Sequence, residues 1–260
     1  KGNTTGPLMY FEEGWSVFGK KNGKVESLLY SGDREKILAM VREMGSMASE
    51  AFRLAVQSLE ERDDALAERV IEEDDAIDDL EATIDHECLC SIAMRQPVRE
   101  DLRFVFAVLK IITDLERIGD QAVNIAEKAL KIKCATTFPK KDRILSMLDT
   151  VLSMFRHALE AFRTGDREAA FALWKQDDEV DEIYAQCYDE FLATAVAGAA
   201  GNHEEVERGA VELWAARHLE RAGDHVINIA ERVYFMVEGK YFPSREEREK
   251  NRKTDDRTNR

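Results

Sequence analysis

The sequence predicts an all-α protein made of two tandem three-helix bundles related by internal pseudo-symmetry. Two observations support this fold class. Long stretches have apolar residues at helical spacing with few helix breakers, and a polar block of residues occurs twice. The 260 residues include only four prolines and fourteen glycines, and between Gly45 and Gly165 the only glycine is Gly119. Such sparse breakers leave room for long helices.

Apolar residues at helical spacing predict three helices in the first half of the chain, at residues 33–60, 65–94 and 98–133. Asp63 or Asp64 can cap the second of these helices, and Pro97 separates it from the third. Helices of about thirty residues would be roughly 45 Å long, which is typical of elongated bundles.

The second half of the chain repeats this organisation, with helices expected at residues 142–164, 167–199 and 202–239. Pro139 interrupts the pattern before them. The sequence Thr164-Gly165-Asp166 is typical of a helix stop followed by a new cap, and Gly201-Asn202 is similar. Because the connections are short, consecutive helices should be antiparallel neighbours.

The two ends of the chain differ from the helical part. Residues 1–31 form an N-terminal extension in which Asn22-Gly23 predicts a small hairpin, unless the segment is a tag. Residues 241–260 are expected to be a charged, flexible tail. The two bundles are then assigned to residues 32–138 and 139–240. The chain does not begin with Met, which leaves a fragment of a longer protein as an open alternative.

An internal repeat is the most informative feature of the sequence. Residues 114–127 recur as residues 218–231, with nine of fourteen positions identical at an offset of 104. Residues 74–80 recur as residues 177–183 at an offset of 103, in the same order along the chain. This arrangement indicates tandem duplication of a three-helix unit.

The repeated residues include polar ones and glycine, which helical patterning alone does not explain. A glycine inside a helix costs about 1 kcal/mol relative to alanine. Gly119 and Gly223 occupy matching positions on the apolar face of the third helix of each repeat. We expect a neighbouring helix to approach the backbone closely at both glycines.

Acidic residues recur at i, i+4 spacing on two helices of each repeat, which places each pair on one helix face. If these helices pack antiparallel, four carboxylates converge in each repeat and would repel one another without a cation. Oxygen ligands favour hard cations such as Mg, Mn, Ca or iron over zinc. The alternative is a solvated acidic face with ion pairs to Arg117, Arg221 and Lys128. The candidate metal ligands are Asp74, Asp78, Glu116, Asp120, Asp177, Asp181, Glu220 and Asp224. The residues that could contact these ligands without binding the metal themselves are Arg117, Asn124, Arg221 and Asn228.

The charge balance of the chain restricts the class of partner. The sequence has 37 basic and 52 acidic residues, which gives a net charge of −15. Nucleic-acid binding relies on basic residues that neutralise phosphates, so the acidity argues against nucleic acid. The longest stretch without a charged residue or histidine is twelve residues, at 191–202, too short to span a bilayer. The four scattered cysteines favour a reducing cytoplasm.

The paired Leu-Glu-Arg-x-Gly-Asp-x-x-x-Asn-Ile-Ala-Glu segments, each preceded by an acidic i, i+4 pair, resemble the PhoU family of bacterial phosphate-uptake regulators. The resemblance covers residues 32–240. It implies that each repeat holds a multinuclear metal cluster of iron or zinc, with Mn and Mg as further options. It also implies a cytoplasmic, often homodimeric, negative regulator of the phosphate-starvation response and phosphate uptake. Such regulators contact the phosphate ABC transporter and a sensor histidine kinase. The family's E(D)xxxD motif corresponds here to Asp74 with Asp78, Glu116 with Asp120, Asp177 with Asp181, and Glu220 with Asp224.

Three other interpretations remain open from the sequence. The chain resembles the PhoU-like regulatory domains fused to sodium–phosphate cotransporters. A carboxylate-bridged di-metal oxidase usually supplies Glu-x-x-His pairs. None of the five histidines has a glutamate three residues before it, which weighs against this enzyme. A purely structural scaffold is the third. No phosphate-binding glycine loop or nucleophile elbow is present, so no enzyme is expected. His218 and His225 are expected to be surface or cap residues.

Overall fold

The computed structural model describes residues 31–132, 140–198 and 203–243. This part of the chain folds into helices and contains no β-strand. The hairpin expected in residues 1–31, the loops at Pro139 and Gly201-Asn202, and residues 244–260 of the expected tail lie outside it. The helices are α1 (Ser31–Glu61), α2 (Asp64–Arg95), α3 (Glu100–Lys131), α4 (Lys141–Thr164), α5 (Arg167–Ala172), α6 (Trp174–Gly198) and α7 (His203–Glu238).

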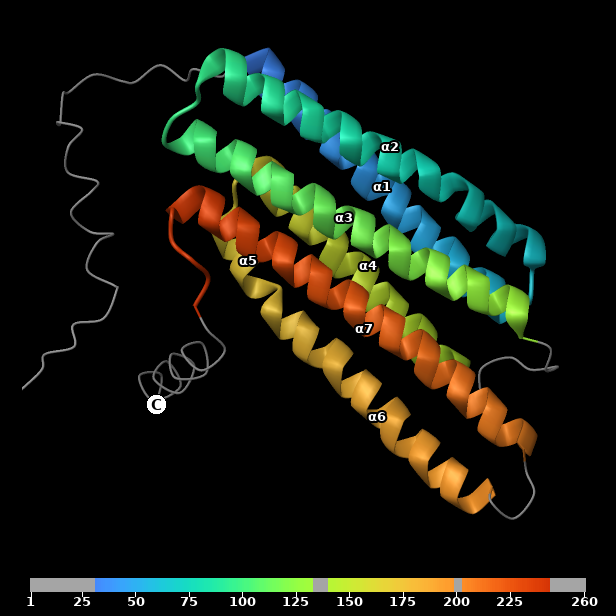
Figure 1. The fold of residues 1–260 in the computed structure, drawn as a ribbon. Helices are drawn as coiled ribbons and strands as arrows, with labels where there is room; N and C mark the ends of the chain where they lie inside the picture. The colour runs from blue at the N-terminus through green and yellow to red at the C-terminus, as the bar shows by residue number, and fades with distance from the viewer. Residues whose placement is uncertain (1–30, 133–139, 199–202, 244–260) are drawn as a thin grey trace, which may run out of the picture.

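The third helices of the two repeats, α3 and α7, pack against each other at the centre of the molecule (Figure 1). Helices α1 and α2 pack on α3, whereas α4, α5 and α6 pack on α7. Figure 1 shows α2, α3, α7 and α6 side by side in one layer, with α1 and α4 behind them. The predicted all-α fold with two related three-helix bundles is confirmed.

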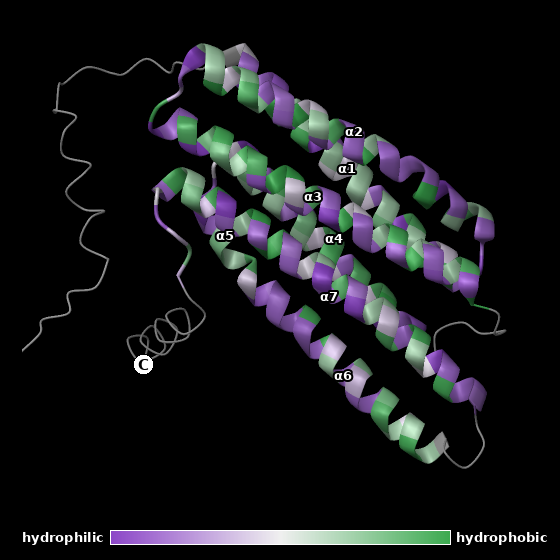
Figure 2. Cartoon of the chain, viewed as in Figure 1, coloured by the Kyte–Doolittle hydropathy of each residue, from purple (hydrophilic) through white to green (hydrophobic). Residues whose placement is uncertain are grey.

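The burial pattern follows from this arrangement. The central helix α3 is apolar on two sides, because it contacts both its own bundle and α7. In contrast, α2 buries a narrow stripe that includes Val70, Ile77 and Ile84. Figure 2 shows the hydrophilic residues that cover much of the rest of α2. Acidic residues next to the stripe therefore lie where α2 meets α3.

The predicted helix ends are largely confirmed. The carboxylate of Asp63 accepts a hydrogen bond from the backbone N–H of Leu66 and so caps α2. Gly165 ends α4 with a positive φ of 68°, and Asp166 caps α5 by accepting from two backbone N–H groups. At Pro97 the chain turns through Gln96 and Arg99, both with positive φ, so α3 begins at Glu100 rather than at the expected residue 98.

The single helix expected at residues 167–199 is wrong, because the chain breaks at Leu173 into α5 and α6. Leu173 and the next residue, Trp174, are both buried. The backbone tightens here, with Leu173 N–H bonded to the carbonyl of Ala170 and Gln176 N–H to that of Leu173. Such i, i+3 bonds are typical of a 3₁₀ turn.

Candidate functional site

The close approach predicted at the two repeated glycines is present. A Cβ atom placed on Gly119 of α3 would lie 3.2 Å from Oδ1 of Asp74 and 3.2 Å from Cδ1 of Ile77 on α2. The same atom on Gly223 of α7 would lie 3.5 Å from Oδ1 of Asp177 on α6. Each glycine therefore lets one carboxylate lie directly against the backbone of the central helix, and the fit is tighter in the first repeat.

The first repeat brings its four predicted ligands into electrostatic contact. Burial raises the pKa of Asp74 to about 6, and the nearby charges of Asp78 and Asp120 raise it as well. Burial likewise raises the pKa of Glu116 to about 7, again with a contribution from Asp120. The pKa of Asp78 is raised by burial and by Asp120. Carboxylates from α2 and α3 thus face one another across the helix pair, with Asp120 common to all three interactions.

The second repeat shows the same arrangement between α6 and α7. Burial raises the pKa of Asp177 to about 7, with added repulsion from Asp181, Asp224 and Glu220. The pKa of Glu220 is raised by burial and by the charge of Asp224. All eight predicted ligands therefore belong to two carboxylate clusters, one in each repeat.

Glu81 in the first repeat and Arg217 in the second, neither of them among the predicted ligands, make the clusters unequal. Glu81 accepts a hydrogen bond from Thr113 Oγ1 at 3.1 Å, and its charge helps to raise the pKa of Glu116. The matching positions in the second repeat are occupied by Tyr184 and Arg217. The guanidinium of Arg217 lies 2.9 Å from both carboxylate oxygens of Glu220. The first cluster therefore contains an additional acid, Glu81, and the second contains an additional base, Arg217.

Sequence spacing could have identified Glu81, because residues 74, 78 and 81 follow i, i+4 and i+7 on one face of α2. It was missed because Glu81 has no acidic counterpart in the second repeat. The internal repeat marks only the residues that the two sites share.

The donor set fits a hard metal cation. Both clusters offer carboxylate oxygens, which are the ligands that Mg, Mn, Ca and oxidised iron prefer. Burial, and after it the mutual repulsion of the carboxylates, raises the pKa values of Asp74, Glu116 and Asp177, and a bound cation relieves that repulsion. In the described part of the chain, no three His, Cys, Asp or Glu side chains already surround a common point. A metal ion would have to draw the carboxylates closer together.

The residues expected to support the ligands lie in different environments. Arg117 and Arg221 are exposed, and their charges lower the pKa values of Glu116 and Glu220 respectively. Asn124 donates to the backbone carbonyl of Asp120 at 2.7 Å. Asn228, at the matching position, instead donates to Asp114 on α3 at 3.1 Å.

The expectation that His218 and His225 are surface or cap residues is wrong. Both are half-buried in the middle of α7, where that helix packs on α3. Nδ1 of His225 lies 2.9 Å from the carboxylate of the buried Asp114, and Nδ1 of His218 lies 2.8 Å from Oε1 of Gln121. Asp114 aligns with His218 and Gln121 aligns with His225 in the repeat. Each contact therefore joins one of these two repeat positions on one helix to the other position on the opposite helix, and the two contacts are related by the pseudo-symmetry of the repeats.

Comparisons with known proteins identify the family. The family model of the PhoU domain matches the chain twice, over residues 41–129 and 144–233. The chain belongs to the PhoU family. A relative from Clostridium acetobutylicum, a phosphate-specific transport system accessory protein PhoU homolog, is 33% identical over 213 residues, covering 82% of this chain and 95% of the relative. PhoU homolog 1 of Thermotoga maritima is 36% identical over 220 residues, covering 83% and 88% of the two chains.

Solved structures agree with this assignment. Crystalline PhoU from Pseudomonas aeruginosa superposes with a TM-score of 0.74 and 31% identity, covering 82% of this chain and all of the other. The PhoU phosphate transport system regulatory protein from Streptococcus pneumoniae gives a TM-score of 0.71 at 27% identity, covering 81% and 97%. Within the described residues, no helix combines the length and apolar character needed to cross a membrane.

Proposed function

We propose that this chain is a metal-binding negative regulator of the phosphate-starvation response and of phosphate uptake. The observation that carries the proposal is the pair of carboxylate clusters, built at matching positions of a duplicated PhoU domain. Relatives named as accessory proteins of the phosphate-specific transport system support the physiological context. The partners would be the phosphate ABC transporter and a sensor histidine kinase, contacted from the cytoplasm by a homodimer.

In this proposal, each repeat holds one multinuclear metal cluster, with iron preferred and Zn, Mn or Mg as alternatives. Asp74, Asp78, Glu116 and Asp120 would hold the first cluster, and Asp177, Asp181, Glu220 and Asp224 the second. The metal supplies positive charge that changes repulsion between α2 and α3, and between α6 and α7, into attraction. The protein then regulates by stoichiometric contact, without catalytic turnover.

The arrangement of histidines favours a regulator over a di-metal oxidase. Oxidases of helical bundles usually combine carboxylates with histidine ligands from Glu-x-x-His pairs. Here His218 and His225 are directed to Gln121 and Asp114 on α3, in the interface between repeats.

Metal stoichiometry by mass spectrometry tests the metal sites. The variant Glu116→Gln/Asp120→Asn keeps the shape of the first cluster but removes two charges. It should lose metal from the first repeat alone, because the second cluster is built on other helices. Glu220→Gln/Asp224→Asn is the matched variant for the second repeat. The proposal of two independent sites would be contradicted if either variant kept the metal content of the wild type. It would also be contradicted if the mutations in one repeat removed the metal from both.

Gene deletion tests the regulatory role. Phosphate-starvation genes should be expressed in phosphate-rich medium when the gene is deleted, and wild-type protein should restore repression. Complementation with Glu116→Gln/Asp120→Asn then asks whether the metal is needed for regulation. Repression that persists in the deletion strain would refute the proposed role.

A further inference from the structure

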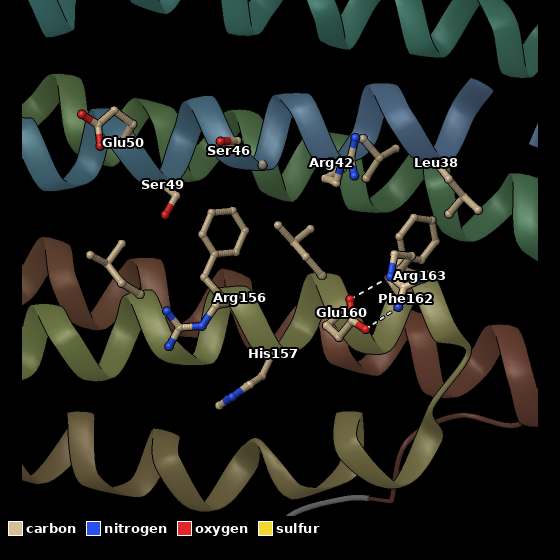
Figure 3. A pocket seen from close by; sticks show the side chains of 15 residues that line it. Leu38, Arg42, Ser46, Ser49, Glu50, Arg156, His157, Glu160, Phe162 and Arg163 are labelled. Carbon is tan, nitrogen blue, oxygen red and sulfur yellow. Dashed lines mark hydrogen bonds and ion pairs between the residues drawn. The ribbon is translucent and has the colours of Figure 1, made fainter. Parts of the chain in front are cut away.

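A groove lies between α1 and α4, on the layer opposite the side-by-side helices α2, α3, α7 and α6 (Figure 3). Its volume is about 710 Å³. The two helices touch at Gly45, where an added Cβ atom would lie 2.5 Å from Cδ1 of Leu159. On both sides of this contact the floor is apolar, formed by Leu38, Val41, Leu152, Phe155, Leu159 and Phe162.

The rim of this groove carries basic side chains, although the whole chain has a net charge of −15. Glu50 and Glu160 on the rim are hydrogen-bonded to Arg53 and Arg163 of their own helices. Arg42 of α1 and Arg156 of α4 are exposed, and neither forms an ion pair with another described residue. The groove therefore suits an apolar segment with acidic side chains.

The chain itself contains such a segment. Residues 8–18, Leu-Met-Tyr-Phe-Glu-Glu-Gly-Trp-Ser-Val-Phe, include seven large apolar side chains, two acids and no base. Exposing this many apolar side chains to water is unfavourable, because burial of each one is worth about 1.5–3 kcal/mol. Residues 244–260, at the other end of the chain, contain no large apolar side chain and do not match the groove.

The connection between segment and groove is long enough. The groove begins at Leu38, seven residues into α1, roughly 10 Å from the start of that helix at a rise of 1.5 Å per residue. It ends at Glu50, roughly 18 Å further along α1. The twelve residues 19–30 can extend over roughly 40 Å when the turn expected at Asn22-Gly23 is not formed. Residues 8–18 can therefore reach the whole length of the groove.

We propose that residues 8–18 of this chain occupy the groove between α1 and α4, with Glu12 and Glu13 beside Arg42 and Arg156. Apolar side chains of the segment cover the floor, and the acids neutralise the two rim guanidiniums. A partner that uses this groove must then displace the chain's own segment. The proposal does not depend on the metal clusters, because the groove uses none of their residues.

Photo-crosslinking of the full chain tests the proposal. Phe11→p-benzoylphenylalanine places a photoreactive group in the segment, and the crosslinked residues are mapped by mass spectrometry. The expected products are intramolecular, join Phe11 to residues 38–50 or 152–163, and form in a yield independent of protein concentration. The same photoreactive group at exposed Tyr188 of α6 controls for non-specific reaction.

Charge reversal provides the decisive comparison. Glu12→Lys/Glu13→Lys should lower the yield roughly threefold or more, as expected for the loss of two exposed ion pairs. Adding Arg42→Glu/Arg156→Glu should restore it, whereas Lys110→Glu on α3, an exposed position that does not line the groove, should not. The proposal would be overturned by crosslinks between two copies of the chain or by crosslinks to residues outside the groove. It would also be overturned if the crosslinking yield did not change with these charge reversals.

Discussion

At the scale of single residues, the two repeated glycines offer a comparison within one molecule. Alanine in place of a helical glycine gains about 1 kcal/mol in helix propensity. At Gly223 the new methyl group would meet ordinary contacts at 3.5 Å and 3.6 Å, so Gly223→Ala should be neutral or stabilising. At Gly119 both contacts are at 3.2 Å, which requires Asp74 and Ile77 to move. Gly119→Ala should therefore be less stable than Gly223→Ala by about 1 kcal/mol.

Denaturant unfolding of the metal-free variants measures this difference. Metal titration of the same proteins is an internal check, because only Gly119→Ala should also disturb the first cluster. Equal stability of the two variants would show that α2 moves away from α3 without strain.

The guanidinium of Arg217 predicts unequal metal affinities. It lies against Glu220 in the second repeat, where the first repeat has Thr113 and an additional acid, Glu81. Manganese should therefore bind the first cluster more tightly. Arg217→Thr, which gives the second repeat the residue of the first, should tighten the weaker site roughly tenfold, the effect of removing one nearby charge.

Calorimetric titration with manganese resolves the two sites. Arg69→Thr, at an exposed position on α2 beside Glu73, removes the same charge away from the second cluster and should leave both affinities unchanged. A weaker site that is unaffected by Arg217→Thr would mean that the guanidinium swings away when metal binds.

At the scale of helices, matching caps begin the second helix of each repeat. Asp63 accepts one backbone N–H, from Leu66, whereas Asp166 accepts two, from Glu168 and Ala169. Replacement of either aspartate by alanine should lower the free energy of unfolding by about 0.5–2 kcal/mol. The loss should be larger for Asp166→Ala, and asparagine at either position should retain most of the stability. Denaturant titration checks the order, which is contradicted if Asp63→Ala is the more damaging change.

These caps also show why helix positions could be predicted from the sequence. Gly165 and Asp166 act through the backbone of their own turn, so local sequence is sufficient to place the end of α4 and the start of α5. The break at Leu173 could not be predicted in this way. No glycine or proline marks this break, and the two residues at it, Leu173 and Trp174, are both buried, so the local sequence carries no stop signal there.

At the scale of the whole molecule, the contacts of the carboxylates could be predicted from the sequence, whereas those of the histidines could not. The repeat predicted which carboxylates share a cluster, because each cluster lies between two helices of one repeat. It could not predict the contacts of His218 and His225, because they cross from one repeat to the other. Asp114 and Gln121 lie 111 and 97 residues away from those partners.

The stability of the metal-free protein should decrease as pH rises from about 6.5 to 8. The pKa of Asp177 is raised from 3.8 to about 7, so the unfolded chain releases this proton at lower pH than the folded chain. Glu116, raised from 4.5 to about 7, contributes in the same direction. Folding therefore binds protons in this window, and ionisation weakens the folded state. Each kcal/mol lost should lower Tm by roughly 2–4 °C.

Below this window, a histidine acts in the opposite direction. Burial lowers the pKa of His218 from 6.5 to about 4, so its contribution is complete above pH 6.5 and is lost towards pH 4. Thermal unfolding across pH 6.5–8 with chelator, and again with manganese, checks the prediction. Asp177→Asn should flatten the metal-free profile, and manganese should flatten that of the wild type. A profile that rises with pH without metal would contradict the assignment.

The crosswise contacts between α3 and α7 lead to the last prediction, which concerns how the two repeats are held together. Asp114 is buried and accepts hydrogen bonds from both His225 and Asn228, whereas Gln121 and His218 form one bond between neutral groups. Asp114→Ala leaves two donors of α7 without their acceptor and should cost about 2–4 kcal/mol. Gln121→Ala should cost about 1 kcal/mol.

A double-mutant cycle separates this coupling from the effect of the cavity. Asp114→Ala and His225→Ala should be non-additive by more than 1 kcal/mol, because the first change already removes the contact that the second would break. The same cycle for Gln121 and His218 should give a smaller term. Additive losses for Asp114 and His225 would show that apolar packing alone joins α3 to α7. A large coupling would mean that the buried acid of α3 and the histidine of α7 depend on each other in holding the two repeats together.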